Sequence, residues 1–189
     1  MNDDFLEIKT SLKILNDIPI PWFVCGGQAV DLFLDKKTRD HADLEIGIFR
    51  KDQMTIRAHL KAFTFWKVNS GERSLLDTNE FLELPTHELL LEKDSEKLEV
   101  LLNEESGEGW VYRRNLAIKL PIAKSILKSR SGLSFLAPEI VLLYKSTHCR
   151  PKDDADFKSL LPHLNKEQKE WLKESLAITS PKHHWIEKL

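Results

Sequence analysis

Two carboxylates placed two residues apart are the first sign of chemistry in this chain. Asp43 and Glu45 alternate with apolar residues, which is the period-two pattern of a β-strand. Side chains two apart on a strand project to the same face, with Cα atoms about 6.5–7 Å apart. This spacing lets two carboxylates share one or two divalent cations. The alternative is that both acids form the solvent-facing side of a half-buried sheet.

A pair of glycines precedes this strand. Gly26 and Gly27 follow a short apolar strand, 22–25, and precede residues 28–34, which have the pattern of the first turns of a helix. A glycine turn at a helix amino terminus presents N–H groups and the helix dipole to phosphate oxygens. The alternative is a pair of glycines required only by packing or turn geometry. A phosphate site beside a metal site is what nucleotidyl transfer needs.

A third acid is expected from a neighbouring strand. In the segment 97–103, Glu99 lies on the face opposite to an aliphatic row formed by Leu98, Val100 and Leu102. This repeats the pattern of the first pair, so we expect Glu99 to be a third metal ligand or a general base. The alternative is an acid on an exposed strand face.

Several charged residues support this hypothesis less directly. Arg39 and His41 lie just before the acidic strand, where a triphosphate or an acceptor could reach them, although His41 could instead hold the loop through a hydrogen bond. Asp31 is expected to be structural, by capping a turn or by pairing with Arg39. Lys145, on an expected helix, could reach the triphosphate or be an ordinary exposed lysine.

The elements that must position these residues alternate between helix and strand. The periodicity predicts helices over 4–15, 28–34 and 51–61, and strands over 22–25, 43–49, 63–68, 87–93, 97–103 and 109–114, with a turn at 106–109. Helices follow from Pro138. We therefore expect an α+β fold in which residues 1–137 form a mixed β-sheet with flanking helices and residues 138–189 form a C-terminal helical subdomain.

Composition and cysteine content limit the class of protein. The chain has 189 residues, of which 41% are hydrophobic and 31% charged, as in ordinary globular domains. We find no basic-then-apolar leader and no apolar run of about 18 residues, so no membrane association is expected. Cys25 and Cys149 do not form a disulfide framework, and we expect a reduced, cytoplasmic protein. The adjacent His183 and His184 lack the spacing of a metal site.

The charges are unevenly distributed along the chain. Residues 72–99 contain nine acids and three bases, whereas residues 113–152 contain nine bases and one acid. This asymmetry suits a cationic substrate beside an anionic cosubstrate, and the alternative is two solvated surfaces without a partner. No basic run is interleaved with aromatic residues, which makes a long nucleic acid an improbable substrate.

The segment CGGQAVDLFLDKKTRDHADLEIGIFR resembles the signature of the nucleotidyltransferase superfamily, which has the polymerase-beta-like fold. It is most similar to the aminoglycoside and lincosamide nucleotidyltransferase-like branch, with Gly-Gly-x-Ala-x-Asp followed by Arg-x-His-x-Asp-x-Asp/Glu. The similarity continues through LEVLLNEESGEGWVYRRN to LAPEIVLLYKSTHCRPKDDADF, and so covers residues 22–157.

This resemblance implies roles for particular residues. Gly26 and Gly27 would hold the triphosphate, Asp43 and Glu45 would bind the metal, and Glu99 would be the third acid. The family more often has aspartate at the positions of Glu45 and Glu99.

The resemblance also implies an activity. It is a Mg²⁺-dependent nucleotidyl transfer from a nucleoside triphosphate, with ATP expected, to a hydroxyl group of a small acceptor. The acceptor would be an aminoglycoside or lincosamide antibiotic, hence a role in antibiotic resistance. Two alternatives remain at this stage: a protein side chain as acceptor, and a nucleotide-binding regulatory domain without turnover.

Overall fold

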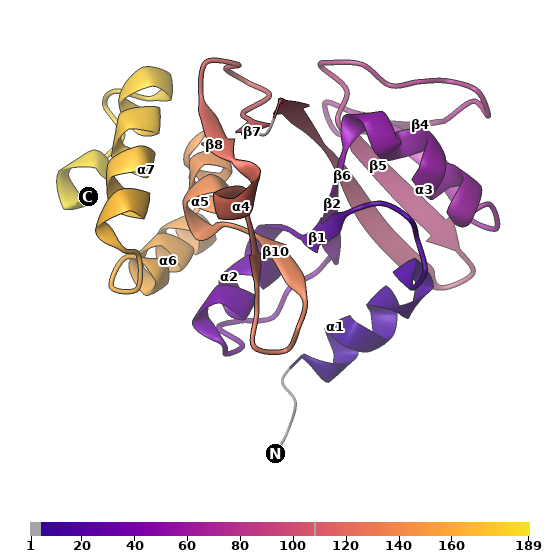
Figure 1. Cartoon of the computed structure of the whole chain (residues 1–189), viewed down its shortest axis with the longest axis horizontal. Helices are drawn as coiled ribbons and strands as arrows, with labels where there is room; N and C mark the ends of the chain where they lie inside the picture. Colours follow the sequence, from indigo (N-terminus) through magenta and orange to yellow (C-terminus); the bar gives the residue numbers. More distant parts are fainter. Residues whose placement is uncertain (1–4, 108) are drawn as a thin grey trace.

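A mixed β-sheet forms the centre of the molecule, in a computed structural model that describes residues 5–107 and 109–189 (Figure 1). Ten strands are found in the described part of the chain: β1 Trp22–Val24, β2 Glu45–Phe49, β3 Thr64–Asn69, β4 Glu72–Leu75, β5 Glu88–Lys93, β6 Glu96–Ser106, β7 Gly109–Val111, β8 Lys119–Pro121, β9 Ile126–Lys128 and β10 Ser134–Leu136. Their order is β4-β3-β5-β6-β2-β1-β10-β9, with β7 paired to β6 and β8 paired to β7.

The helices flank this sheet and follow it. They are α1 Leu6–Ser11, η1 Leu12–Leu15, α2 Gly26–Leu34, η2 Arg50–Asp52, α3 Gln53–His59, α4 Ile122–Ser125, α5 Pro138–Ser146, α6 Pro151–Leu160, α7 Lys166–Thr179 and η3 Ile186–Lys188. In Figure 1, α6 and α7 lie at one end of the molecule and α3, β4 and β5 at the other, with β1 and β2 between them. The expected α+β fold with a mixed sheet and C-terminal helices is confirmed.

The centre of the sheet sets the register that the site depends on. Strands β2 and β6 are parallel and place Glu45 opposite Glu99, and the Glu99 N–H donates to the Leu44 carbonyl oxygen at 3.0 Å. Strand β1 is antiparallel to β2, with Val24 opposite Ile46. The aliphatic faces of these strands are buried in the core, while the acids lie on the other face.

Most predicted elements are present. The predicted helix over 4–15 corresponds to α1 and η1, although Asp4 lies outside the described residues, and the four predicted strands after residue 62 correspond to β3, β5, β6 and β7. The predicted turn at 106–109 contains Glu108, which also lies outside the described part. The sequence pattern missed β4, β8, β9 and β10, which are only three or four residues long. The equally short β1 and β7 were predicted within the longer segments 22–25 and 109–114.

The helices after residue 137 pack through α5 and α6 on helix α2, which in turn contacts β2 and β10. Helix α5 begins at Pro138, the residue at which the second subdomain is expected, and it contacts α2, α6 and α7. After α7 the chain returns to α6, where the buried Trp185 ring stacks on Phe157 with ring centroids 4.4 Å apart. Among the described helices, none is long and apolar enough to cross a membrane.

Candidate active site

A cavity of about 410 Å³ lies where the acidic strands meet the amino terminus of α2. All seven residues that the sequence identified for chemistry line it: Gly26, Gly27, Arg39, Asp43, Glu45, Glu99 and Lys145. Both charged stretches of the sequence contribute to the cavity wall. Glu88 and Glu99 come from the acidic stretch, and the basic stretch supplies Arg113, Arg150 and Lys152.

The three acids face one cavity but are not in close contact. Among the described residues, the carboxylate oxygens of Asp43, Glu45 and Glu99 do not all lie within 4.8 Å of one another. Burial, and after it the charges of Glu45, Glu88 and Asp43, together raise the pKa of Glu99 to about 7. Burial likewise raises the pKa of Glu45, and Asp43 adds to this effect, while Lys145 opposes it. These acids therefore repel one another, and a cation between them would relieve the repulsion.

The glycines of the turn make room for the acidic and basic side chains. Gly26 has a φ of +59°, and a Cβ atom at this position would lie 1.4 Å from Oε2 of Glu45. A Cβ atom on Gly27 would lie 2.4 Å from Nδ1 of His41 and 2.5 Å from Nη2 of Arg39. Only glycine allows the three side chains to approach the start of α2 so closely. The binding of a triphosphate by this turn stays a prediction.

His41 holds the loop before β2, as one of the two interpretations expected. Its Nε2 lies 2.7 Å from Oδ2 of Asp31 on α2. Oδ1 of Asp31 accepts hydrogen bonds from the backbone N–H of Thr38, at 3.0 Å, and from the Thr38 hydroxyl. The expected pairing of Asp31 with Arg39 is wrong, because His41 and Thr38 occupy both oxygens of this carboxylate.

The basic side of the cavity is a network of ion pairs around two buried carboxylates, those of Asp153 and Asp156. Asp156 on α6 accepts hydrogen bonds from Nε of Arg39, at 3.2 Å, and from Nη2 of Arg39, at 3.1 Å. Nζ of Lys145 lies 2.9 Å from Asp156 and 3.0 Å from Asp153. The side chain of Lys145 is only 10% exposed, so the interpretation of an ordinary exposed lysine is wrong. Arg150 also pairs with Asp153, at 2.8 Å.

Two further residues anchor the chain in front of β5, and sequence reasoning missed them. Arg50 donates to the carbonyl oxygens of Leu82, at 3.1 Å, and Thr86, at 2.8 Å. Gln53 forms reciprocal hydrogen bonds with the backbone of Leu82, donating at 3.0 Å and accepting at 2.7 Å. These contacts fix the residues that enter β5. No local periodicity could indicate them, because both are side-chain bonds to a distant loop.

The far wall of the cavity combines charge with aromatic packing. Glu88 lies on the face of β5 opposite to the buried Leu89, and Glu99 has the same position relative to its own buried neighbours on β6. This alternation could have identified Glu88 from the sequence. The guanidinium of Arg113 lies 5.4 Å from the ring centroid of Tyr144. Burial and, after it, the charge of Arg113 together lower the pKa of His87 to about 4, so this histidine is neutral near pH 7.

Comparisons with protein families and with solved structures identify one matching family and several similar folds. A family model described as aminoglycoside-2''-adenylyltransferase matches residues 7–129. The solution structure of the antibiotic-resistance factor ANT(2'')-Ia matches with a TM-score of 0.62 at 16% identity, over 94% of this chain and 95% of that one. No curated protein sequence matches significantly.

Two crystal structures share the same fold. ANT(2'')-Ia in complex with adenylyl-2''-tobramycin matches with a TM-score of 0.61 at 14% identity, over 92% of this chain and 97% of that one. The lincosamide antibiotic adenylyltransferase LnuA, with lincomycin bound, gives a TM-score of 0.54 at 14% identity, over 85% and 96% of the two chains. At these identities the structural matches show the fold.

Proposed function

Because the chain belongs to the aminoglycoside-2''-adenylyltransferase family, a family of nucleotidyltransferases, we propose that it transfers AMP from ATP to a hydroxyl group of an antibiotic-like small molecule. The observation that carries the proposal is the register of β2 and β6, which places Glu45 opposite Glu99 in one cavity with Asp43. The reaction forms an O–P bond from the acceptor hydroxyl to the α-phosphorus of ATP, and it releases pyrophosphate.

The residues present fit a Mg²⁺ site. Their donor set consists of carboxylate oxygens, which Mg²⁺ prefers, and the pKa of Glu99 is raised first by burial and then by the neighbouring acids, whose repulsion a cation would relieve. Asp43, Glu45 and Glu99 would hold the ion. When bound, Mg²⁺ neutralises charge on the phosphate oxygens and activates the incoming hydroxyl.

The remaining chemistry belongs to this chain's own side chains. Arg39, Lys145 and the turn at Gly26 and Gly27 hold the triphosphate, because cations and helix amino termini stabilise phosphate charge. Glu99 takes the proton of the acceptor hydroxyl as general base. The catalytic effect rests on orientation and charge neutralisation.

The acidic part of the cavity favours an acceptor with amino groups. Glu88 and Glu99 project into it, and burial together with neighbouring carboxylates raises the pKa of both. An ammonium group of an aminoglycoside would reduce this repulsion. We therefore place aminoglycosides ahead of lincosamides as acceptors.

A second candidate function is nucleotide binding without transfer. The observation that favours it is the position of Glu45, whose carboxylate lies against Gly26, where a phosphate would approach. In this state the protein would bind ATP and leave every acceptor unmodified.

The test is a transfer assay on the purified chain. It is incubated with ATP, Mg²⁺ and a panel of aminoglycosides and lincosamides, and adenylylated products are detected by mass spectrometry. We expect transfer that falls by roughly 100-fold or more in Asp43→Asn. The matched control is Asp40→Asn, a fully solvated acid paired with Lys37 outside the cavity, which should retain activity. Binding of ATP with no transfer to any acceptor would favour the second function.

A further inference from the structure

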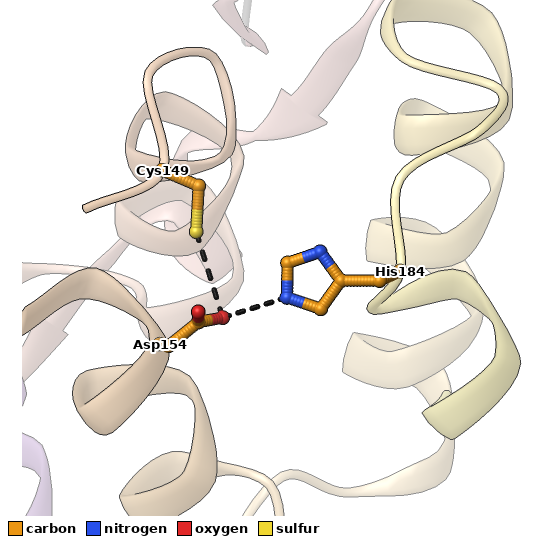
Figure 2. A group of neighbouring side chains, drawn as sticks. All are labelled: Cys149, Asp154 and His184. Carbon is orange, nitrogen blue, oxygen red and sulfur yellow. Dashed lines mark hydrogen bonds and ion pairs between the residues drawn. The ribbon is translucent and has the colours of Figure 1, made fainter. Parts of the chain in front are cut away.

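Three side chains of the metal-binding type meet outside the cavity (Figure 2). Cys149 lies in the turn after α5, Asp154 in the first turn of α6, and His184 in the segment that follows α7. A thiol sulfur, a carboxylate oxygen and an imidazole nitrogen from these residues all lie within 4.8 Å of one another. The ligands come from three separate segments, so the spacing of His183 and His184 alone could not reveal the cluster.

The three groups converge on one oxygen atom. Oδ1 of Asp154 lies 2.7 Å from Nε2 of His184 and 3.6 Å from Sγ of Cys149. The thiol and the imidazole thus both contact the carboxylate, and no hydrogen bond joins them to each other among the described residues. A nucleophilic cysteine needs its histidine as a base within hydrogen-bond reach. The geometry is therefore that of a ligand cluster and not that of a catalytic triad.

The packing around the cluster orients its ligands. Trp185 is fully buried, and its indole N–H donates to the same Oδ1 of Asp154 at 2.7 Å. The ring of His184 stacks on that of His183, with centroids 4.7 Å apart. Such hydrogen bonds and stacked neighbours fix the direction of metal ligands. The His184 side chain is 53% exposed and that of Asp154 is 37% exposed, so an ion can reach both from solvent.

From this geometry we propose that Cys149, Asp154 and His184 bind one Zn²⁺ ion, with water as the fourth ligand. Sulfur, nitrogen and oxygen together form a borderline donor set that suits Zn²⁺, whereas Mg²⁺ takes oxygen ligands. Zinc–ligand bonds of about 2.0–2.3 Å at tetrahedral angles put ligand atoms roughly 3.3–3.5 Å apart. The sulfur–oxygen pair already has nearly this separation, and the nitrogen–oxygen pair must open by roughly 0.6–0.8 Å.

Binding replaces the hydrogen bonds of the cluster by bonds to the ion. The Cys149 thiol loses its proton to solvent, and the thiolate, the carboxylate and the neutral imidazole each donate an electron pair to Zn²⁺. The ion then links the C-terminal segment to the start of α6. The neighbouring Asp153 on the same turn holds Lys145 and Arg150, so the zinc site braces the basic side of the cavity. The site does not depend on the proposed transfer activity.

The proposal is tested with Co²⁺, which replaces Zn²⁺ and reports thiolate ligation by a sulfur-to-cobalt charge-transfer absorption. The full chain is freed of metal with a chelator and titrated. We expect a band that saturates at one ion per chain and disappears on addition of Zn²⁺. Cys149→Ser should abolish the band, and Cys25→Ala, which removes the other cysteine, should leave it. The absence of the band in the wild-type chain, or its survival in Cys149→Ser, would overturn the proposal.

The imidazole ligand is tested separately. Because the His184 side chain is largely exposed, its substitution should leave the fold intact. His184→Gln should weaken Co²⁺ binding by at least roughly 10–100-fold, the loss typical for residues that only support a metal site. His148→Gln, an exposed histidine one residue before Cys149, is the matched control and should bind as the wild-type chain does. Zn²⁺ should raise the melting temperature of the wild type and of His148→Gln, and not that of His184→Gln. Equal affinity and equal shifts in all three proteins would refute the site.

Discussion

Glu45 on β2 lies directly opposite Glu99 on β6, and the pKa values of both carboxyls are raised above the ordinary range, first by burial and then by neighbouring acids. Two like charges on adjacent strands destabilise a sheet. Holding both carboxylates at this position concentrates negative charge there. In the proposed reaction this charge binds a divalent cation.

The first prediction concerns Glu99→Gln. Its folded pKa of about 7 lies above the ordinary 4.5, so ionised Glu99 opposes folding. The penalty is absent below about pH 4.5, grows between pH 4.5 and 7, and is complete above pH 7. Glutamine should therefore raise the free energy of unfolding at pH 8 by about 1–2 kcal/mol after solvent screening, and by less at pH 5.

The same variant should lose transfer activity by roughly 100-fold or more. Stability is measured by urea unfolding in a chelator, so that divalent ions do not contribute, and activity by the antibiotic transfer assay. A gain in stability together with a loss of activity marks a site residue. Unchanged transfer in Glu99→Gln would remove this residue from the catalytic set.

The second prediction uses a buried acid away from the cavity. Burial raises the pKa of Glu139 on α5 to about 7, although Gln168 donates a hydrogen bond to it at 2.8 Å. As for Glu99, the ionised form of Glu139 opposes folding, and this penalty develops over the same pH window. Glu139→Gln should therefore stabilise the protein by about 2 kcal/mol at pH 8 and by less at pH 5. Here transfer activity should be retained, and the exposed Glu174→Gln should change neither property. A destabilised Glu139→Gln at pH 8 would contradict the assigned pKa.

The third prediction compares two glycines with positive φ. A Cβ atom added to Gly71, which has a φ of +83°, would meet no atom within 4 Å, so Gly71→Ala should cost only the backbone strain of about 1 kcal/mol. Gly26→Ala adds a clash with the Glu45 carboxylate, which must turn away from α2, and should cost more than Gly71→Ala. Chemical denaturation measures both. Equal costs would show that Glu45 moves freely away from the turn.

The fourth prediction concerns Asp156, the one carboxylate that joins Arg39 to Lys145 among the described residues. Asp156→Asn removes the charge between two partly buried cations, which should destabilise the fold by about 2–3 kcal/mol and raise the KM for ATP. The control is Asp35→Asn, whose partner Arg130 is exposed, with an expected cost below about 1 kcal/mol. If the KM for ATP stays constant, Arg39 and Lys145 do not bind the triphosphate.

The sequence predicts those parts of the site that depend on local pattern. Alternation predicted Asp43 and Glu45 on one face of a strand and Glu99 on another strand, and the glycine pair predicted the start of a helix. The structure begins β2 at Glu45, so Asp43 lies just before the strand and not within it. The register between β2 and β6 could not be predicted, because three strands and about 50 residues separate them along the chain. The pairing of Lys145 with Asp156 was equally inaccessible, since it depends on how α5 packs on α6. The same limitation hid the fact that Cys149 and His184 both contact Asp154.

The central claim is that Asp43, Glu45 and Glu99 together hold the divalent ion that serves ATP. The most direct measurement is a crystal structure of the chain with Mg²⁺ and a non-hydrolysable ATP analogue. We predict Mg²⁺ at about 2.0–2.1 Å from carboxylate oxygens of these acids, with the phosphates beside Gly26 and Gly27. A Mg²⁺ ion held by phosphates alone, with the side chains of Glu45 and Glu99 turned away from it, would contradict the claim.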